Sequence, residues 1–193
     1  MTVSAAPEDD DVAAAQRGDV RAFENLFLCV QPPLLRYLRT LVGADCADVA
    51  SETWLQVTRD LPRFRGDGAD FKGWVVTIGR HRALDHLRAT RRRPSDPVDP
   101  AEMPARTAPN DTFYATEEAM ATRRALTLIA RLPRDQAEAV LLRVVVGLDA
   151  PAAAKVLGKR AGAVRMATSR GLARLEQLVA DEPGVTLPDP RAL

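Results

Sequence analysis

The chain has 193 residues, which is enough for one medium domain or two small ones. Hydrophobic residues make up 46% of it and charged residues 27%, as in ordinary proteins that fold in water around a buried core. No apolar run approaches the roughly 20 residues that cross a membrane, and the acidic N-terminus lacks the basic start and apolar block of a signal peptide. We therefore expect a cytoplasmic protein without membrane insertion.

The first half of the chain predicts four helices. One begins at Asp11 and is expected to end at Pro32-Pro33, because proline removes a helical hydrogen-bond donor and restricts the residue before it. A second helix ends at Gly43, where glycine is a natural stop. A third covers residues 45–61, with Asp45 as its N-cap.

The fourth helix, residues 71–93, follows a glycine-containing loop at residues 63–70. It combines an apolar stripe at three- and four-residue spacing with a run of arginines. The stripe consists of Phe71, Trp74, Val75, Ile78, Leu84 and Leu87. The basic residues are Arg80, Arg82, Arg88, Arg91, Arg92 and Arg93, opposed only by Asp85. A helix that anchors in a core and presents several guanidinium groups suits a polyanionic partner.

The second half predicts further helices after a proline-rich stretch. Asp135 is expected to cap one helix, which Gly147 ends. Asp149 caps a short helix, and Gly158 forms the turn into a longer one. The residues of this longer helix that we expect to face inward are Val164, Ala167, Leu172, Leu175 and Leu178.

These elements predict an all-α protein with two small helical domains, the second containing a helix-turn-helix. We expect the first domain at residues 11–93 and the second at 117–180. Between them, residues 94–116 have the composition of a flexible linker. Residues 1–10 are expected to be a disordered acidic tail, and residues 181–193 a second tail.

The helix-turn-helix segment is strongly basic. No acidic residue lies between Lys155 and Glu176, and arginines occupy the outward positions of the longer helix. A recognition helix in the major groove needs an apolar inner face and an outer face of donors for phosphates and base edges. This pattern favours DNA binding over the alternative, a solvated basic face of an ordinary bundle helix.

Other chemistry finds little support in the sequence. Cys29 and Cys46 are isolated, so buried thiols are the simplest interpretation, and no residues have the spacing of a metal site. There is no nucleophile–base arrangement and no glycine-rich phosphate loop. We expect no cofactor and no enzymatic activity.

Three longer stretches carry a family resemblance. They are DCADVASETWLQV, FRGDGADFKGWVVTIGRHRALDHLRATRRR and LPRDQAEAVLLRVVVGLDAPAAAKVLGKRAGAVRMATSRGLARL, supported by Ala22-Phe23 and Leu35-Arg36-Tyr37. The first half resembles region two of a bacterial sigma factor and the second half resembles region four. The chain is most similar to the extracytoplasmic-function class (sigma-70 family, group four), which keeps only these two regions.

This resemblance implies a factor that binds core RNA polymerase and directs it to a restricted set of promoters. The third helix would dock on the clamp helices of the largest polymerase subunit, through Asp48, Val49, Ser51, Glu52, Trp54 and Leu55. A purely structural, buried Trp54 remains an alternative. The class also implies an anti-sigma factor as a partner.

The resemblance further implies two sets of contacts with promoter DNA. The residues for the minus-ten element, including a flipped base, would be Phe64, Arg65, Gly66, Asp67, Lys72, Arg80, His81, Arg88, Arg91 and Arg92. Those for the minus-thirty-five element would be Lys159, Arg160, Arg165, Met166, Ser169 and Arg170. The family often has asparagine where this chain has His81, and lacks a basic pair like Lys159-Arg160, so promoter preference is expected to differ. The alternative function is a helix-turn-helix regulator whose N-terminal half senses a ligand or mediates dimerisation.

Overall fold

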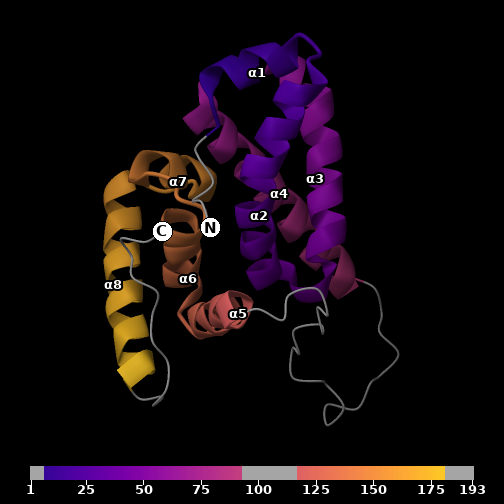
Figure 1. The fold of residues 1–193 in the computed structure, drawn as a ribbon. Helices are drawn as coiled ribbons and strands as arrows, with labels where there is room; N and C mark the ends of the chain where they lie inside the picture. Colours follow the sequence, from indigo (N-terminus) through magenta and orange to yellow (C-terminus); the bar gives the residue numbers. More distant parts are fainter. Residues whose placement is uncertain (1–6, 93–116, 181–193) are drawn as a thin grey trace.

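The computed structural model describes residues 7–92 and 117–180, and every regular element within these ranges is helical (Figure 1). The all-α prediction is therefore confirmed. The predicted linker, residues 94–116, and the predicted tail, residues 181–193, lie outside the described residues, as do residues 1–6. None of the described helices combines the length and the apolarity needed to cross a membrane.

Part of the expected N-terminal tail belongs to the fold. Helix α1 covers Asp9–Gln16 and α2 covers Val20–Val42, separated by a turn at Gly18 with φ of 92°. The Asp9 carboxylate accepts a hydrogen bond from the backbone N–H of Gly68 at 2.7 Å. The prediction of disorder for residues 1–10 is thus wrong from Asp9 onward, because a contact distant in sequence holds this end.

Helix α2 does not end at its proline pair, as the sequence predicted. It passes through Pro32 and Pro33 and ends at Gly43, where φ is 65°. Proline in a helix interior costs about 3 kcal/mol or more. Residues on both sides of the pair, Val30 and Leu34, are completely buried, so one continuous buried stripe offsets that cost.

Helix α3 (Cys46–Asp60) follows a short 3-10 turn, η1 (Gly43–Asp45), and leads into a second one, η2 (Leu61–Arg63). The prediction that Asp45 caps α3 is wrong, because its side chain accepts no capping hydrogen bond. Its carboxylate instead lies 2.8 Å from Nε2 of His86 on the next helix. Asp45 thus contacts a side chain of the next helix instead of capping its own helix.

Helix α4 (Gly68–Arg92) begins before the predicted start at residue 71, because the Asp67 side chain accepts a hydrogen bond from the backbone N–H of Asp70 at 2.7 Å. Phe71 and Val75 are completely buried, and α4 packs against α2 and α3. Gly79 permits a close approach, since a Cβ there would lie 2.9 Å from Cδ1 of Leu34. The basic helix is therefore anchored in the core of the first half.

Within residues 117–180, the second half consists of four α-helices and a π-helical segment. These are α5 (Glu117–Ala130), α6 (Arg134–Val140) continuing into η4 (Leu141–Val145), α7 (Ala150–Leu157) and α8 (Ala161–Ala180). Asp149 accepts a hydrogen bond from the backbone N–H of Ala152 and Gly158 is left-handed, as predicted. Pro133, not Asp135, occupies the N-cap of α6, so the predicted cap is wrong by two positions.

One inward position of α8 is also corrected. Leu172 is 40% exposed, while Gly171 beside it is buried. A Cβ on Gly171 would lie 2.7 Å from Cγ2 of Val140, so α6 and α8 approach each other where only glycine fits. Gly171 therefore lies at the contact between α6 and α8, and the larger Leu172 beside it points to solvent.

The two halves pack together around one continuous set of buried residues. Helix α7 lies against α4, and η4 contacts α2. Figure 1 shows α3 on the far side of the first half, away from α7 and α8.

Candidate nucleic-acid interface

Helices α7 and α8 form the predicted helix-turn-helix. The inner side of α8 is anchored by Val164 and Leu175, which are buried against the second half. Its outer side presents side chains to solvent: Arg165, Met166, Ser169 and Arg170 are all exposed. Met166 is 55% exposed, which is unusual for a large apolar side chain and leaves it free to touch a ligand.

Two more predicted contacts lie just before α8. Lys159 and Arg160 are both exposed at the turn that starts this helix. Nζ of Lys159 lies 3.6 Å from the carboxylate of Asp135 on α6. We name the six residues Lys159, Arg160, Arg165, Met166, Ser169 and Arg170 the recognition surface. It combines flexible cations, one hydroxyl and one thioether on a rigid helix, which suits phosphates and base edges.

The start of α4 and the loop before it form a second surface. Phe64 is buried, with its ring centroid 5.7 Å from Phe71 in an edge-on arrangement and 4.8 Å from Trp74. Gly66 has φ of 152°, and a Cβ there would lie 2.7 Å from Cβ of Asp70. The loop is therefore held against an aromatic cluster, in a backbone conformation that glycine favours.

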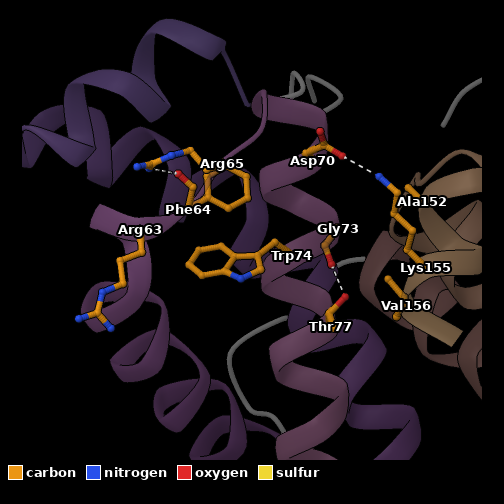
Figure 2. Close-up of a pocket in the computed structure, with 10 residues that line it drawn as sticks. All are labelled: Arg63, Phe64, Arg65, Asp70, Gly73, Trp74, Thr77, Ala152, Lys155 and Val156. Atoms are coloured by element: carbon orange, nitrogen blue, oxygen red, sulfur yellow. Dashed lines mark hydrogen bonds and ion pairs between the residues drawn. The ribbon is translucent and has the colours of Figure 1, made fainter. Parts of the chain in front are cut away.

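A cavity of about 430 Å³ opens between this loop, α4 and α7 (Figure 2). Its walls include the cations Arg63, Arg65 and Lys155, and the aromatic ring of Trp74. Arg65 donates a hydrogen bond from Nη1 to the carbonyl oxygen of Phe64 at 2.9 Å. The carboxylate of Asp70 also lines the cavity. Cations beside the half-buried ring of Trp74 suit a nucleobase that carries its phosphate.

Arg80, a predicted DNA contact, points into the junction between the halves. Its guanidinium Nη2 lies 3.0 Å from Glu138 Oε2 on α6, and its side chain is only 17% exposed. Glu138 is buried, and the exposed Arg134 also donates to it at 3.1 Å. Sequence reasoning missed Glu138. Its one signal was a lone carboxylate between the apolar residues Ala137 and Ala139.

Tyr37 of α2 lies beside this pair. Burial, and next the negative charge of Glu138, raises the pKa of the Tyr37 hydroxyl above its ordinary range, although the Arg80 guanidinium opposes the shift. Lys72 of α4 also lies toward the second half, with Nζ 3.5 Å from where a Cβ on Gly147 would sit. Burial lowers the pKa of Lys72. In this arrangement both Arg80 and Lys72 face protein.

The remaining predicted contacts on α4 lie toward solvent. His81, Arg88 and Arg92 are exposed, and Arg88 pairs with Asp85 on the same helix at 2.8 Å. The side chain of Arg91 lies outside what the structure describes. We use the name minus-ten surface for the residues that the sequence predicts to contact this element. They are the loop from Phe64 to Asp67, with Lys72, Arg80, His81, Arg88, Arg91 and Arg92 of α4.

On α3 the structure divides the predicted polymerase contacts into two groups. Asp48, Ser51, Glu52 and Leu55 are exposed, and Leu55 is 68% exposed. Val49 and Trp54 are buried. Trp54 packs its ring 4.8 Å from that of Phe27 and donates a hydrogen bond to Gln31 at 2.6 Å. The alternative in which Trp54 is a buried, purely structural residue therefore fits its position.

The cysteines show no sign of a disulfide or metal centre in the described ranges. Cys46 is buried and Cys29 is half-buried, and both are thiols. Within residues 7–92 and 117–180, no group of three or more histidine, cysteine or acidic side chains could hold a metal ion.

Comparison with protein families matches both halves. Residues 26–93 match sigma-70 region 2, and residues 122–175 match sigma-70 region 4. The chain is 36% identical over 178 residues to the ECF RNA polymerase sigma factor ShbA of Streptomyces griseus, covering 86% of this chain and 92% of ShbA. It is 34% identical over 184 residues to the ECF RNA polymerase sigma factor SigD of Mycobacterium tuberculosis, covering 91% of this chain and 85% of SigD.

Solved structures show the same fold. CnrH, in complex with the cytosolic domain of CnrY, superposes with a TM-score of 0.64 at 22% identity, covering 91% of this chain and 99% of CnrH. The sigma factor RpoE of Bartonella quintana, in complex with the anti-sigma factor NepR, gives a TM-score of 0.61 at 22% identity, covering 83% of this chain and 98% of RpoE. The two matched regions, their order and these relatives show that the chain belongs to the sigma-70 family, as an extracytoplasmic-function RNA polymerase sigma factor.

Proposed function

We propose that this sigma factor directs core RNA polymerase to promoters through three surfaces, one each on α3, α4 and α8. A sigma factor is not an enzyme, and polymerisation belongs to the partner. The proposed units are residues 11–93 for polymerase and the minus-ten element, and residues 117–180 for the minus-thirty-five element. Because a sigma factor acts on bacterial RNA polymerase, we propose a cytoplasmic location for this protein.

The observation that carries the proposal is the recognition surface on α8. Arg165, Met166, Ser169 and Arg170 are exposed on α8, which packs against α6 and α7, and Lys159 and Arg160 are exposed at the turn before it. The N-terminal part of such a helix enters the major groove, where arginine pairs with guanine and phosphates fix the register. We assign Arg165, Met166, Ser169 and Arg170 to base edges, and Lys159 and Arg160 to the backbone.

We assign the minus-ten surface to the melted strand. A flipped base costs a few kcal/mol of stacking, and new stacking and edge contacts return about 1–3 kcal/mol per base. The cavity beside Trp74, lined by Arg63 and Arg65, supports this assignment because it offers a ring and cations together. Exposed His81, Arg88 and Arg92 continue along α4 for the phosphates that follow.

We assign the exposed side of α3 to core polymerase, specifically to the clamp helices of the largest subunit. Leu55 supplies an exposed apolar anchor, and Asp48 and Glu52 supply negative charge around it. An exposed leucine with an acidic rim suits a partner with an apolar groove and basic edges. Val49 and Trp54 contribute by keeping α3 in place rather than by touching the partner.

We also propose an anti-sigma factor as a partner. The structures of CnrH and RpoE, each determined with a bound partner, are the observation behind this proposal. A natural target is the pair of DNA-binding surfaces, since covering them silences the factor.

Transcription from purified parts tests the proposed function. Core RNA polymerase from a bacterium that carries one of the similar sigma factors, such as Streptomyces griseus, is expected to start transcription at promoters that bind this chain when the chain is added. Core enzyme alone is the control. Sequence-specific binding to duplex DNA without any transcription, on a library of promoters, would instead support the helix-turn-helix regulator.

A further inference from the structure

Helix α1 holds both ends of the loop that precedes α4. At the first end, Nε2 of Gln16 donates hydrogen bonds to the carbonyl oxygens of Leu61 at 3.0 Å and Phe64 at 2.9 Å. At the second end, the Asp9 carboxylate accepts a hydrogen bond from the backbone N–H of Gly68 at 2.7 Å. The partners in these bonds are 45 to 59 positions apart in the chain. The shape of the loop therefore depends on a helix that is distant in sequence.

The carbonyl oxygen of Phe64 takes part in a further contact. It also accepts a hydrogen bond from Nη1 of Arg65 at 2.9 Å, and Figure 2 shows the Arg65 side chain turned back toward it. Gln16 and Arg65 thus share one acceptor, so the position of the Arg65 guanidinium depends on a group that Gln16 fixes. The ring of Phe64 packs 4.8 Å from that of Trp74. Phe64 is therefore held both at its side chain and at its backbone.

The segment before α1 lies directly on Gly68. A Cβ on this glycine would collide with the backbone carbonyl of Pro7, and it would lie 3.3 Å from Oδ1 of Asp9. Only glycine lets the two backbones approach so closely. Pro7 and Gly68 are both buried, so this contact belongs to the packed structure and not to a loose end of the chain.

Between the two anchors, residues 65–67 project from the fold. Arg65, Gly66 and Asp67 are exposed, whereas Phe64 and Gly68 on either side are buried. A segment of three residues with both ends fixed has few conformations available to it. Such a pre-formed loop loses little conformational entropy when it binds a ligand.

We infer that Gln16 and Asp9 are positioning residues for base selection in the minus-ten element. They touch no DNA themselves, and they hold residues 65–67 in the shape that accepts a flipped base. This role rests on the proposed function of the loop as the site of that base. It gives a task to α1, which carries none of the residues that we expect to contact DNA or polymerase.

The physical consequence is a difference between base selection and general affinity for DNA. Selecting one base over another requires donors and acceptors at fixed positions, because a hydrogen bond weakens steeply as its angle bends. Contacts with phosphates carry no sequence information. Loss of an anchor should therefore reduce the contribution of one base more than it reduces binding to the DNA as a whole.

Binding of fork-junction DNA by the holoenzyme tests this inference. The probe comes from a promoter that supports transcription with this chain. It is duplex upstream, and its non-template strand is unpaired across the minus-ten element. Each unpaired nucleotide is replaced in turn by an abasic site. The holoenzyme contains core RNA polymerase and the full chain, either the parent or Gln16→Met, which removes both hydrogen bonds and keeps a side chain of similar length.

We expect one position at which loss of the base weakens binding by the parent about fivefold more than binding by Gln16→Met. A fivefold difference corresponds to one hydrogen bond of about 1 kcal/mol. At the other unpaired positions, base loss should have the same effect on both chains. Equal effects at every position would overturn the inference, because α1 would then serve only to stabilise the fold.

Asp9 provides an independent test at the other end of the loop. Its side chain is exposed, so Asp9→Ala is expected to fold even if Gln16→Met does not. Asp9→Ala should reduce the effect of base loss at one position, as Gln16→Met does. Asp9→Asn should restore that effect, because its amide oxygen can still accept from the backbone N–H of Gly68. The same result for Asp9→Ala and Asp9→Asn would contradict the assigned role.

A matched control uses another amide that binds α1. Asn25 of α2 donates a hydrogen bond to the Asp11 carboxylate at 3.3 Å, a contact that does not involve the loop. Asn25→Ala should respond to every abasic site as the parent does, and a response like that of Gln16→Met would count against a role specific to the loop.

The same experiment separates this inference from the proposed function. If the holoenzyme with the parent chain does not bind the fork-junction probe or start transcription, the proposed function fails. If the parent binds and depends on a base in the unpaired strand, but Gln16→Met and Asp9→Ala depend on it equally, only the positioning role of α1 is lost.

Discussion

At the scale of single residues, the exposed side chains of α8 differ in what they can read. Arg165 and Arg170 can each donate two parallel hydrogen bonds, whereas Met166 offers only apolar contact. A methionine in this position does not specify a donor or an acceptor, but it can pack on the C5-methyl group of thymine. Each kind of contact leads to a different test.

Replacing Arg165 or Arg170 by alanine is expected to weaken promoter binding by roughly 1–3 kcal/mol each, the worth of a lost bidentate contact. Transcription from a promoter series with and without the minus-thirty-five element measures this loss. Arg124→Ala on α5, exposed and of equal charge, is the control. The same loss on a template lacking the element would contradict the assigned roles.

Because Met166 can make only apolar contact, we expect promoter binding to depend on the methyl group of a single thymine. If it packs on a thymine in the minus-thirty-five element, replacing that thymine by uracil should weaken binding by about 0.8 kcal/mol, or roughly fourfold. Fluorescence anisotropy with each thymine replaced in turn would locate the contact. The Met166→Ala variant should no longer distinguish thymine from uracil, and an unchanged preference in this variant would exclude the contact.

At the scale of elements, the recognition helix is positioned by one close approach. Gly171 lets α8 lie directly on α6, with Val140 and Gln136 in the space a side chain would need. Gly162, in the first turn of the same helix, has no atom within 4 Å of its missing Cβ. The same substitution at these two glycines should therefore have opposite effects.

Gly171→Ala is expected to lower the free energy of unfolding by about 1–3 kcal/mol, because overpacking forces α6 and α8 apart. Gly162→Ala should raise it by up to about 1 kcal/mol, since alanine favours helix and meets nothing. Urea unfolding followed by circular dichroism measures both. If Gly171→Ala proved as stable as Gly162→Ala, the close packing of α6 on α8 would be wrong.

At the scale of the whole molecule, the two halves share one core with a titratable group at their junction. Tyr37 of the first half lies close to Glu138 of the second, and its pKa is raised above the ordinary value of about 10 by burial and by that carboxylate. The folded state therefore keeps the proton that the unfolded state releases at high pH. This linkage makes the junction visible in stability measurements.

The contribution of Tyr37 to stability is complete below about pH 10 and is lost as the pH rises further. Above that pH, the free energy of unfolding should fall by about 1.4 kcal/mol per pH unit for this one group. Tyr37→Phe is the comparison, because it removes the hydroxyl and keeps the ring. Parallel curves for the parent and Tyr37→Phe between pH 9 and 11 would show that Tyr37 is not buried at the junction.

Much of the architecture followed from the sequence because it depends on local chemistry. Helical periodicity predicted an all-α chain, and Asp149, Gly43 and Gly158 marked boundaries that the structure confirms. Local rules failed at Pro32-Pro33 and at Asp45, where the burial of a continuous stripe and a contact with His86 prevailed. In both cases the deciding partner lies outside the reach of a short sequence window.

For the candidate sites, the sequence by itself determined which side chains we propose as DNA contacts and which helix carries most of them. It correctly implied an exposed basic side on α8, because no acid interrupts that segment and the apolar positions had to turn inward. Only the tertiary structure decided that Trp54 and Val49 are buried, and that Arg80 faces Glu138 rather than solvent. The reason is that an isolated helix pattern specifies a buried and an exposed side, but the docking of two halves decides which exposed side is covered.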